Sequence, residues 1–72
     1  MKITELGQAI RARRKAAGIT QLDLAELSGV ALHTISDLEC GKGNPTFSVL
    51  GQLCSVLGLE ISLGVKALEP VK

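Results

Sequence analysis

The sequence predicts an all-α fold class, a small domain of four to five short helices followed by one short β-strand. Two observations predict the helices. Apolar residues recur at three- and four-residue steps over most of the chain, and glycines stand where the periodic runs stop. A third observation predicts the strand, because the spacing changes to strict alternation after residue 58.

Composition limits the size and the kind of core. The 72 residues are 46% hydrophobic but only 1% aromatic, so the core must be built from aliphatic side chains, which suits packed short helices. A chain of this length buries a small core, which favours oligomerisation. Phe47 is the one aromatic residue, so few rings are available to stack on single-stranded nucleic acid.

The first helix is expected over residues 4–17, where Leu6 and Ile10 lie near one face. Thr4 can cap its start, and Gly18 can supply the left-handed residue after its end. Four of the eight basic residues fall within five positions near the helix end: Arg11, Arg13, Arg14 and Lys15. Cations are favoured there by the helix dipole. The cluster is therefore either a solvated face or a nucleic-acid surface, and the net charge of +1 does not decide.

The second helix is expected over residues 21–28. Thr20 followed by Asp23 three residues later is a variant of the capping box that marks a helix start. Three apolar residues then share one face: Leu24, Ala25 and Leu27.

The third helix is expected over residues 32–39, where Ile35 and Leu38 form an apolar stripe after Gly29. Helices of about eight residues are too short to be stable alone, so the second and third must pack on each other and on their neighbours. Two short helices joined by a tight glycine turn are typical of the helix-turn-helix, whose second helix enters the major groove of DNA.

A fourth helix is expected to follow a turn-rich loop over residues 41–45. Thr46 is a natural N-cap, and Gly58 marks the end near residue 57. Apolar residues recur along this helix at helical steps: Phe47, Leu50, Leu53, Cys54 and Leu57. Cys54 is interpreted as a small core residue rather than a reactive thiol.

The alternating segment places four apolar residues on one face of a predicted strand: Leu59, Ile61, Leu63 and Val65. An unpaired strand with an apolar face is a template for association. We expect residues 59–66 to pair with the same strand of a second copy across a two-fold axis. The alternative is an extended tail packed on its own helices. Residues 67–72 are expected to form a flexible tail.

Several classes of function are disfavoured. Cys40, Cys54 and the single His33 lack metal-ligand spacing, so neither a metal nor another cofactor is expected. No catalytic residues are expected either, because the chain has no glycine-rich phosphate loop and no nucleophile–base pair at a supporting spacing. The chain shows no secretory or membrane-spanning pattern, which predicts a cytoplasmic protein with reduced thiols; a disulfide between the two cysteines stays open.

Taken together, the capped TQxxLAxxxG run and the ExGKxxPT loop resemble the Cro/C1-type (Xre) helix-turn-helix family, and the resemblance implies a lambda-repressor-like domain over residues 3–58. Four helices followed by LGLEISLGV look like the HipB-like antitoxin branch. The most specific matches are Thr20-Gln21, Leu24-Ala25, Gly29-Val30, Ile35-Ser36, Leu38-Glu39, Gly41-Lys42 and Pro45-Thr46.

The resemblance assigns roles to individual residues. Gln21 would hydrogen-bond a DNA phosphate, and Arg14 would form a structural ion pair with Glu39. Exposed residues of the third helix would face base edges or flanking phosphates: Leu32, His33, Ser36 and Asp37. Residues of the next loop and helix start would touch the DNA backbone: Lys42, Asn44 and Thr46.

The chain departs from the family pattern on the reading face. Ala31 stands where a capping Ser or Thr is usual, a loss of about 1 kcal/mol. Leu32 can contact a thymine methyl, and Asp37 can accept from a cytosine amino group or is a solvated charge that repels phosphate. Cys40 removes a common phosphate contact. His33 is either a base or phosphate contact or an ordinary exposed residue.

The resemblance implies a repressor that binds a palindromic operator in double-stranded DNA as a homodimer. In the HipB-like branch such a protein is an autoregulating antitoxin that also holds a HipA-like toxin kinase. Two alternatives stay open. One is a stand-alone or phage-type repressor, and the other is a protein-interaction module on the same scaffold, which exposed Leu22 and Leu32 would suit.

Overall fold

A computed structural model describes residues 2–62 of the chain. It contains four helices: α1 (Ile3–Ala16), α2 (Gln21–Ser28), α3 (Leu32–Glu39) and α4 (Phe47–Leu57). The described residues thus form the all-helical fold that the periodicity predicts, and they contain no strand. Residues 59–62 follow α4 without regular structure. Leu63 and Val65, with the rest of the predicted strand and the tail, lie outside the described residues, so the strand and its pairing stay predictions.

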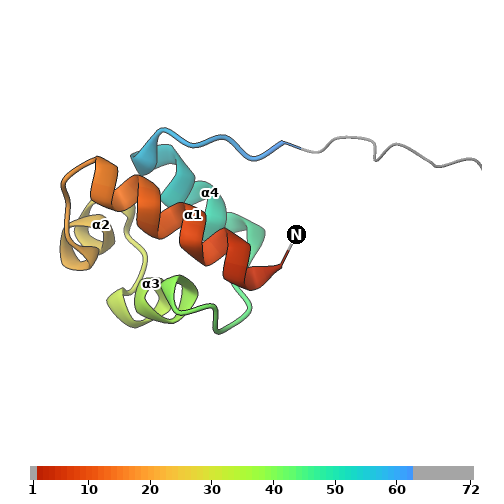
Figure 1. Ribbon diagram of the computed structural model, residues 1–72. Coiled ribbons are helices and arrows are strands. Elements are labelled where there is room, and N and C mark those ends of the chain that lie inside the picture. Colours follow the sequence, from red (N-terminus) through yellow and green to blue (C-terminus); the bar gives the residue numbers. More distant parts are fainter. Residues whose placement is uncertain (1, 63–72) are drawn as a thin grey trace, which may run out of the picture.

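The helices surround one aliphatic core, and α1 crosses the middle of the view in Figure 1. α3 lies on one side of α1 and α4 on the other, while α2 lies near the C-terminal end of α1 and packs on both α3 and α4. The buried apolar residues come from all four helices and the α2–α3 turn: Ile10, Leu24, Val30, Ile35, Leu38, Leu53, Cys54 and Leu57. Cys54 is therefore a core residue as predicted, and both cysteines are free thiols.

Side-chain caps define two of the helix starts. The Thr20 hydroxyl accepts from the Asp23 amide at 3.0 Å, and the Asp23 carboxylate accepts from the Thr20 amide at 2.9 Å, which confirms the capping box. The Thr46 hydroxyl accepts from the Val49 amide at 3.1 Å. The prediction that Thr4 caps α1 was wrong. That helix begins one residue earlier, so Thr4 lies inside its first turn and the N-cap, Lys2, makes no side-chain bond.

Two residues of the predicted apolar helix faces are exposed. Leu27 is 64% exposed and Phe47 is 75% exposed. The buried side of α2 is narrow, because only Leu24 of that helix is fully covered. Phe47 is the first residue of α4, and the buried residues of that helix begin only at Leu53. Helical spacing alone does not show where a short helix reaches the core and where it projects beyond it.

The backbones of α1 and α3 meet at Gly7. This residue is buried, and a Cβ atom placed on it would overlap the carbonyl oxygen of Leu38. The obstacle is backbone, which cannot turn aside as a flexible side chain can. Gly7 therefore sets how closely α3 lies against α1.

We expect Gly7→Ala to lower the free energy of unfolding by about 2 kcal/mol, because the added methyl group forces the two helices apart. Gly51→Ala is the matched control, since Gly51 lies within α4 and a Cβ atom added to it would meet nothing within 4 Å. That substitution should raise the free energy of unfolding by about 0.5 kcal/mol through helix propensity alone. Urea unfolding monitored by circular dichroism measures both. Equal effects of the two substitutions would contradict the close contact at Gly7.

Candidate nucleic-acid interface

A tight turn sets α3 against α2. Gly29 adopts the left-handed conformation with φ of 76°, and its amide donates to the Ala25 carbonyl at 2.9 Å. The chain then turns through buried Val30 into α3. Ile35 and Leu38 face the core with 0% and 1% of their surface exposed. The opposite side of α3 is left facing outward, as in a helix-turn-helix motif.

The outward side of α3 carries the residues predicted to face DNA. Leu32, His33 and Asp37 are exposed, whereas Ser36 is half-buried. Ala31 provides no side-chain cap, so the first amides of α3 receive no side-chain partner from it. The helix start therefore keeps unpaired N–H groups of the kind that bind anions.

A hollow of about 230 Å³ separates α3 from the loop that follows it. The Lys42 amide donates to the Asp37 carbonyl at 2.8 Å and holds the loop at the end of the helix. The hollow brings together four of the predicted contact residues and excludes Leu32 and Ser36. Its lining consists of His33, Thr34, Asp37, Leu38, Lys42, Gly43, Asn44 and Pro45. Thr46 follows directly, at the N-cap of α4.

Thr34 is a lining residue that sequence reasoning missed. It is half-buried beside the hollow, between the exposed and the buried sides of α3. Residues three apart are neighbours on a helix surface, so the spacing from Thr34 to Asp37 was a usable signal. Thr34 adds a hydroxyl group to the wall of the hollow.

The basic cluster of α1 divides by role. The Arg13 side chain donates from Nε to the Leu57 carbonyl at 2.7 Å and so satisfies the C-terminal end of α4. Arg14 is buried, whereas Arg11 and Lys15 are exposed. Half of the cluster thus has a structural task, and Lys42 is the basic residue in the lining of the hollow.

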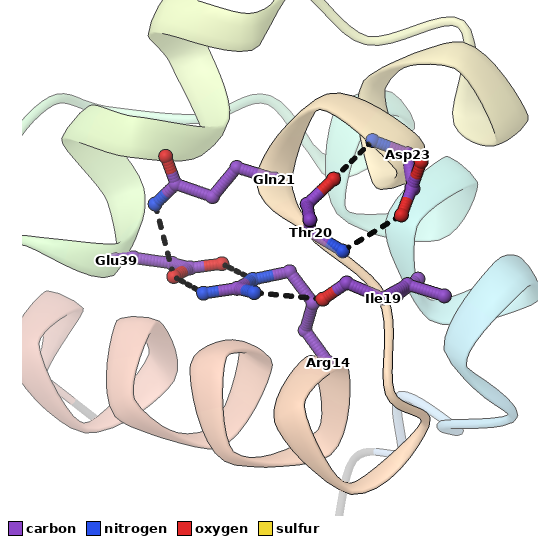
Figure 2. A network of polar contacts seen from close by, with 6 residues as sticks. All are labelled: Arg14, Ile19, Thr20, Gln21, Asp23 and Glu39. Carbon is purple, nitrogen blue, oxygen red and sulfur yellow. Dashed lines mark hydrogen bonds and ion pairs between the residues drawn. The ribbon is translucent and has the colours of Figure 1, made fainter.

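The buried ion pair joins α1 to the end of α3 (Figure 2). Arg14 Nε lies 2.7 Å from Glu39 Oε2, and Arg14 Nη2 lies 2.9 Å from Glu39 Oε1. Arg14 Nη1 also donates to the Ile19 carbonyl at 2.8 Å. The two side chains are only 11% and 2% exposed. This two-bond geometry fixes the relative orientation of the helices as well as their distance.

Gln21 belongs to the same network. Its Nε2 donates to Glu39 Oε1 at 3.1 Å, so the start of α2 is tied to the end of α3 (Figure 2). A glutamine amide carries two N–H groups, and one of them satisfies this bond. The half-buried Gln21 side chain thus bonds to Glu39 with one N–H group. Its other N–H group is the kind of donor that the predicted phosphate contact needs.

The pKa values of the network follow from these bonds. Burial by itself would raise the pKa of Glu39, but the hydrogen bonds from Arg14 and Gln21 together with the nearby positive charges hold it below its ordinary value. The hydrogen bond to Glu39 raises the pKa of Arg14. Near the start of α2, the hydrogen bonds from the backbone and side chain of Thr20 lower the pKa of Asp23. Both carboxylates are therefore charged near neutral pH.

Other kinds of site are not seen in the described part of the chain. Residues 2–62 contain no group of three or more His, Cys, Asp or Glu side chains that could hold a metal ion. Among those residues, no helix combines the length and the apolarity needed to cross a membrane.

The similarity to known proteins covers nearly the same part of the chain that the structure describes. A family model described as Helix-turn-helix matches residues 10–63. An endothelial differentiation-related factor 1 homolog of Xenopus laevis is 39% identical over 57 residues, which cover 79% of this chain and 39% of that protein. An immunity repressor protein of Bacillus phage phi105 is 35% identical over 57 residues, which cover 79% of this chain and 40% of the repressor.

A third relative is close to this chain in length. An "Uncharacterized HTH-type transcriptional regulator" of Methanothermobacter thermautotrophicus is 41% identical over 51 residues, which cover 71% of this chain and 74% of that protein. The aligned part spans about two fifths of the length of the frog and phage proteins.

Glu39→Leu should lower the free energy of unfolding by about 3 kcal/mol, because it leaves the Arg14 charge buried without its partner. The double variant Arg14→Met/Glu39→Leu should recover most of this loss, since it removes both charges and keeps apolar volume. Urea unfolding of the single variants and the double variant forms the test. A double variant as unstable as the sum of the two single variants would contradict a coupled pair.

Acid should weaken the same pair. Because the pKa of Glu39 is depressed by folding, its contribution to stability is complete above the ordinary glutamate range and is lost as pH falls through the folded-state pKa. Between about pH 7 and about pH 3, the wild type should therefore lose more stability than the Arg14→Met/Glu39→Leu variant. Parallel acid slopes in urea unfolding would show that Glu39 does not carry this pH dependence.

Proposed function

The chain belongs to the Cro/C1-type helix-turn-helix family, and from that premise we propose that it is a transcriptional repressor that binds double-stranded DNA as a homodimer. The proposal rests on how α2 and α3 pack. One side of α3 is buried, and the other side lies beside the hollow that Lys42 helps to line. No chemical reaction is required of such a protein. It represses by occupying a promoter.

In the proposed complex α3 lies in the major groove. Leu32, His33, Ser36 and Asp37 then face base edges or the phosphates beside them. Lys42, Asn44 and Thr46 contact the DNA backbone from the hollow and the start of α4, and Gln21 contacts a phosphate from the start of α2. Backbone contacts of this kind fix the orientation of the protein, whereas the α3 contacts select the sequence.

The reading face is unusually apolar and acidic. Leu32 is 43% exposed and suits the methyl group of thymine, and Asp37 can accept from the amino group of cytosine. A carboxylate close to the phosphates also weakens non-specific attraction. We infer that this protein depends on dimerisation for its affinity more than a strongly basic domain would.

The proposed dimer forms through the C-terminal segment, where Leu59, Ile61, Leu63 and Val65 share one face of the predicted strand. Two copies would then place their α3 helices in successive major grooves, about 34 Å apart, on a palindromic operator. A dimer with two-fold symmetry needs a palindromic site, because its two α3 helices contact two equivalent half-sites.

Within this function we favour a HipB-like antitoxin that regulates its own operon and binds a HipA-like toxin kinase. The alternating C-terminal segment, which resembles that branch, motivates this step. A kinase-like reading frame beside the gene would support it. A stand-alone repressor is the second candidate, favoured by the likeness to the immunity repressor of phage phi105. A protein-interaction module is the third candidate, which the exposed side chains of Leu22 and Leu32 would suit.

DNA recognition can be tested without knowing the operator. Repeated selection from a pool of random duplexes should enrich a palindromic site. On the selected duplex, Lys42→Ala should reduce the slope of log affinity against log salt by about one unit, because one phosphate contact is lost.

Lys15→Ala is the matched control. Lys15 is an exposed lysine in the last turn of α1 and lies outside the lining of the hollow, so its loss should leave the slope unchanged. Fluorescence anisotropy over a salt series measures both variants. Failure to enrich any duplex would refute DNA recognition, and equal slopes for Lys42→Ala and wild type would remove Lys42 from the interface.

A further inference from the structure

The side chain of Gln21 lies between the buried ion pair and the helix start that a DNA phosphate is expected to meet. Gln21 is the first residue of α2, and it is half-buried. The capping box satisfies the backbone amides of Thr20 and Asp23, whereas the hydrogen bonds of the described residues include none from the amides of Gln21 and Leu22. Free amides at a helix start favour an anion. A phosphate held there would lie beside the Gln21 side chain.

A glutamine side chain that is free in solution is a poor donor for such a contact. Several rotatable bonds must be fixed when it binds, and the lost rotamer freedom opposes binding. Its carboxamide can also present the carbonyl oxygen instead of an N–H group, and an oxygen would repel a phosphate. A partner that orders the side chain before DNA arrives would remove both disadvantages.

Glu39 is placed to do this. Its Oε1 accepts from Gln21 Nε2 at 3.1 Å, and Figure 2 shows the carbonyl oxygen of Gln21 turned away from it. An ionised carboxylate only accepts hydrogen bonds, so the N–H end of the carboxamide must face it. Glu39 is itself fixed, because Arg14 bonds to both of its oxygens and its side chain is only 2% exposed. The anchor for Gln21 is therefore rigid.

Charge balance makes this anchor compatible with a phosphate. A carboxylate without a counter-charge would repel a phosphate that approached Gln21. The Arg14 guanidinium lies 2.7 Å from Glu39 Oε2 and offsets that negative charge. The pair thus combines the acceptor that the glutamine amide needs with little net charge.

We propose that Glu39 is a positioning residue for DNA binding, which holds the Gln21 carboxamide ready to donate its second N–H group to a phosphate. Arg14 fixes Glu39 and offsets its charge. This inference rests on the proposed DNA binding and gives the buried pair a role beyond stability. It requires that the pair and the phosphate contact be coupled. Without the pair, Gln21 should contribute little to affinity even though its side chain is still present.

One substitution made in two backgrounds tests the coupling. Gln21→Met keeps an unbranched side chain but removes the donor. On the selected duplex it should weaken the affinity of the otherwise wild-type protein about tenfold, because a hydrogen bond to a charged group is lost. In the Arg14→Met/Glu39→Leu background the same substitution should weaken affinity less than about twofold. A purely structural pair would leave the effect of Gln21→Met unchanged. Fluorescence anisotropy at one salt concentration measures all four proteins.

Lys42→Ala is the control for the double background. Lys42 lines the hollow and takes no part in the hydrogen bonds of the Arg14–Glu39 network. Its removal should therefore weaken binding by the same factor with and without the ion pair. If the effect of Lys42→Ala also disappeared in the double background, the loss would reflect a displaced α3, and the specific role of Glu39 would be refuted.

The order of the Gln21 side chain can be measured without DNA and without the double variant. Gln8, an exposed glutamine within α1, is the matched reference. In the free wild-type protein, NMR relaxation of the side-chain N–H groups should give Gln21 an order parameter closer to the value of about 0.85 for rigid backbone than to 0.6. Gln8 should fall below about 0.6, the range of flexible groups.

Two further results would overturn the positioning role: an equal effect of Gln21→Met in both backgrounds, or a Gln21 side chain as mobile as that of Gln8 in the free protein. A wild-type affinity unchanged by Gln21→Met would also overturn it, since there would be no contact to position. Each of these results, with a wild type that binds its selected duplex, would refute the positioning role alone. Failure to enrich any duplex would refute the proposed function, and the positioning role with it.

Discussion

The Arg14–Glu39 pair is the interaction on which the rest of the arrangement depends. It joins two residues that are 25 positions apart in the sequence, and it lies where α1, the start of α2 and the end of α3 meet. Its two parallel bonds need the helices at one distance and one angle, and Gly7 allows that distance by removing the side chain at the crossing. The Ile19 carbonyl accepts a further hydrogen bond from Arg14, and the Gln21 amide donates one to Glu39. A buried charge pair without those partners would be costly, so the network is stable only as a whole.

The scaffold and the reading face of the motif are nearly independent. Ile35, Leu38 and Glu39 hold α3 from behind, and none of them faces outward. His33 and Asp37 on the other side are exposed. The missing cap at Ala31 weakens the start of the helix, but the packed side and the turn at Gly29 keep it in place. Changes on the outward side of α3 should therefore have little effect on how the helix folds.

Local rules predicted most of the fold. Residues 21–28 and 32–39 were both correct as helices, because a glycine and a narrow apolar stripe mark each of them and a capping box also marks the first. The errors at Thr4, Leu27 and Phe47 share a cause: propensity shows that a residue can cap or be buried, but only tertiary packing decides whether it is. The bond from Arg13 to Leu57 had no sequence signal at a separation of 44 residues. The predicted contact residues came from family resemblance, and the geometry adds that four of them line one hollow.

The bond from Arg13 to Leu57 has a mechanical consequence. It anchors the last turn of α4 to α1 at the residue before the chain leaves the helix through Gly58. The departing segment therefore starts from a fixed point on a rigid body rather than from a frayed helix end. In an assembly joined through that segment, as proposed above, the bond from Arg13 to Leu57 would hold the start of each connection against α1. The few residues after Gly58 would then set the range of spacings between the joined copies, and the four helices of each copy would move together.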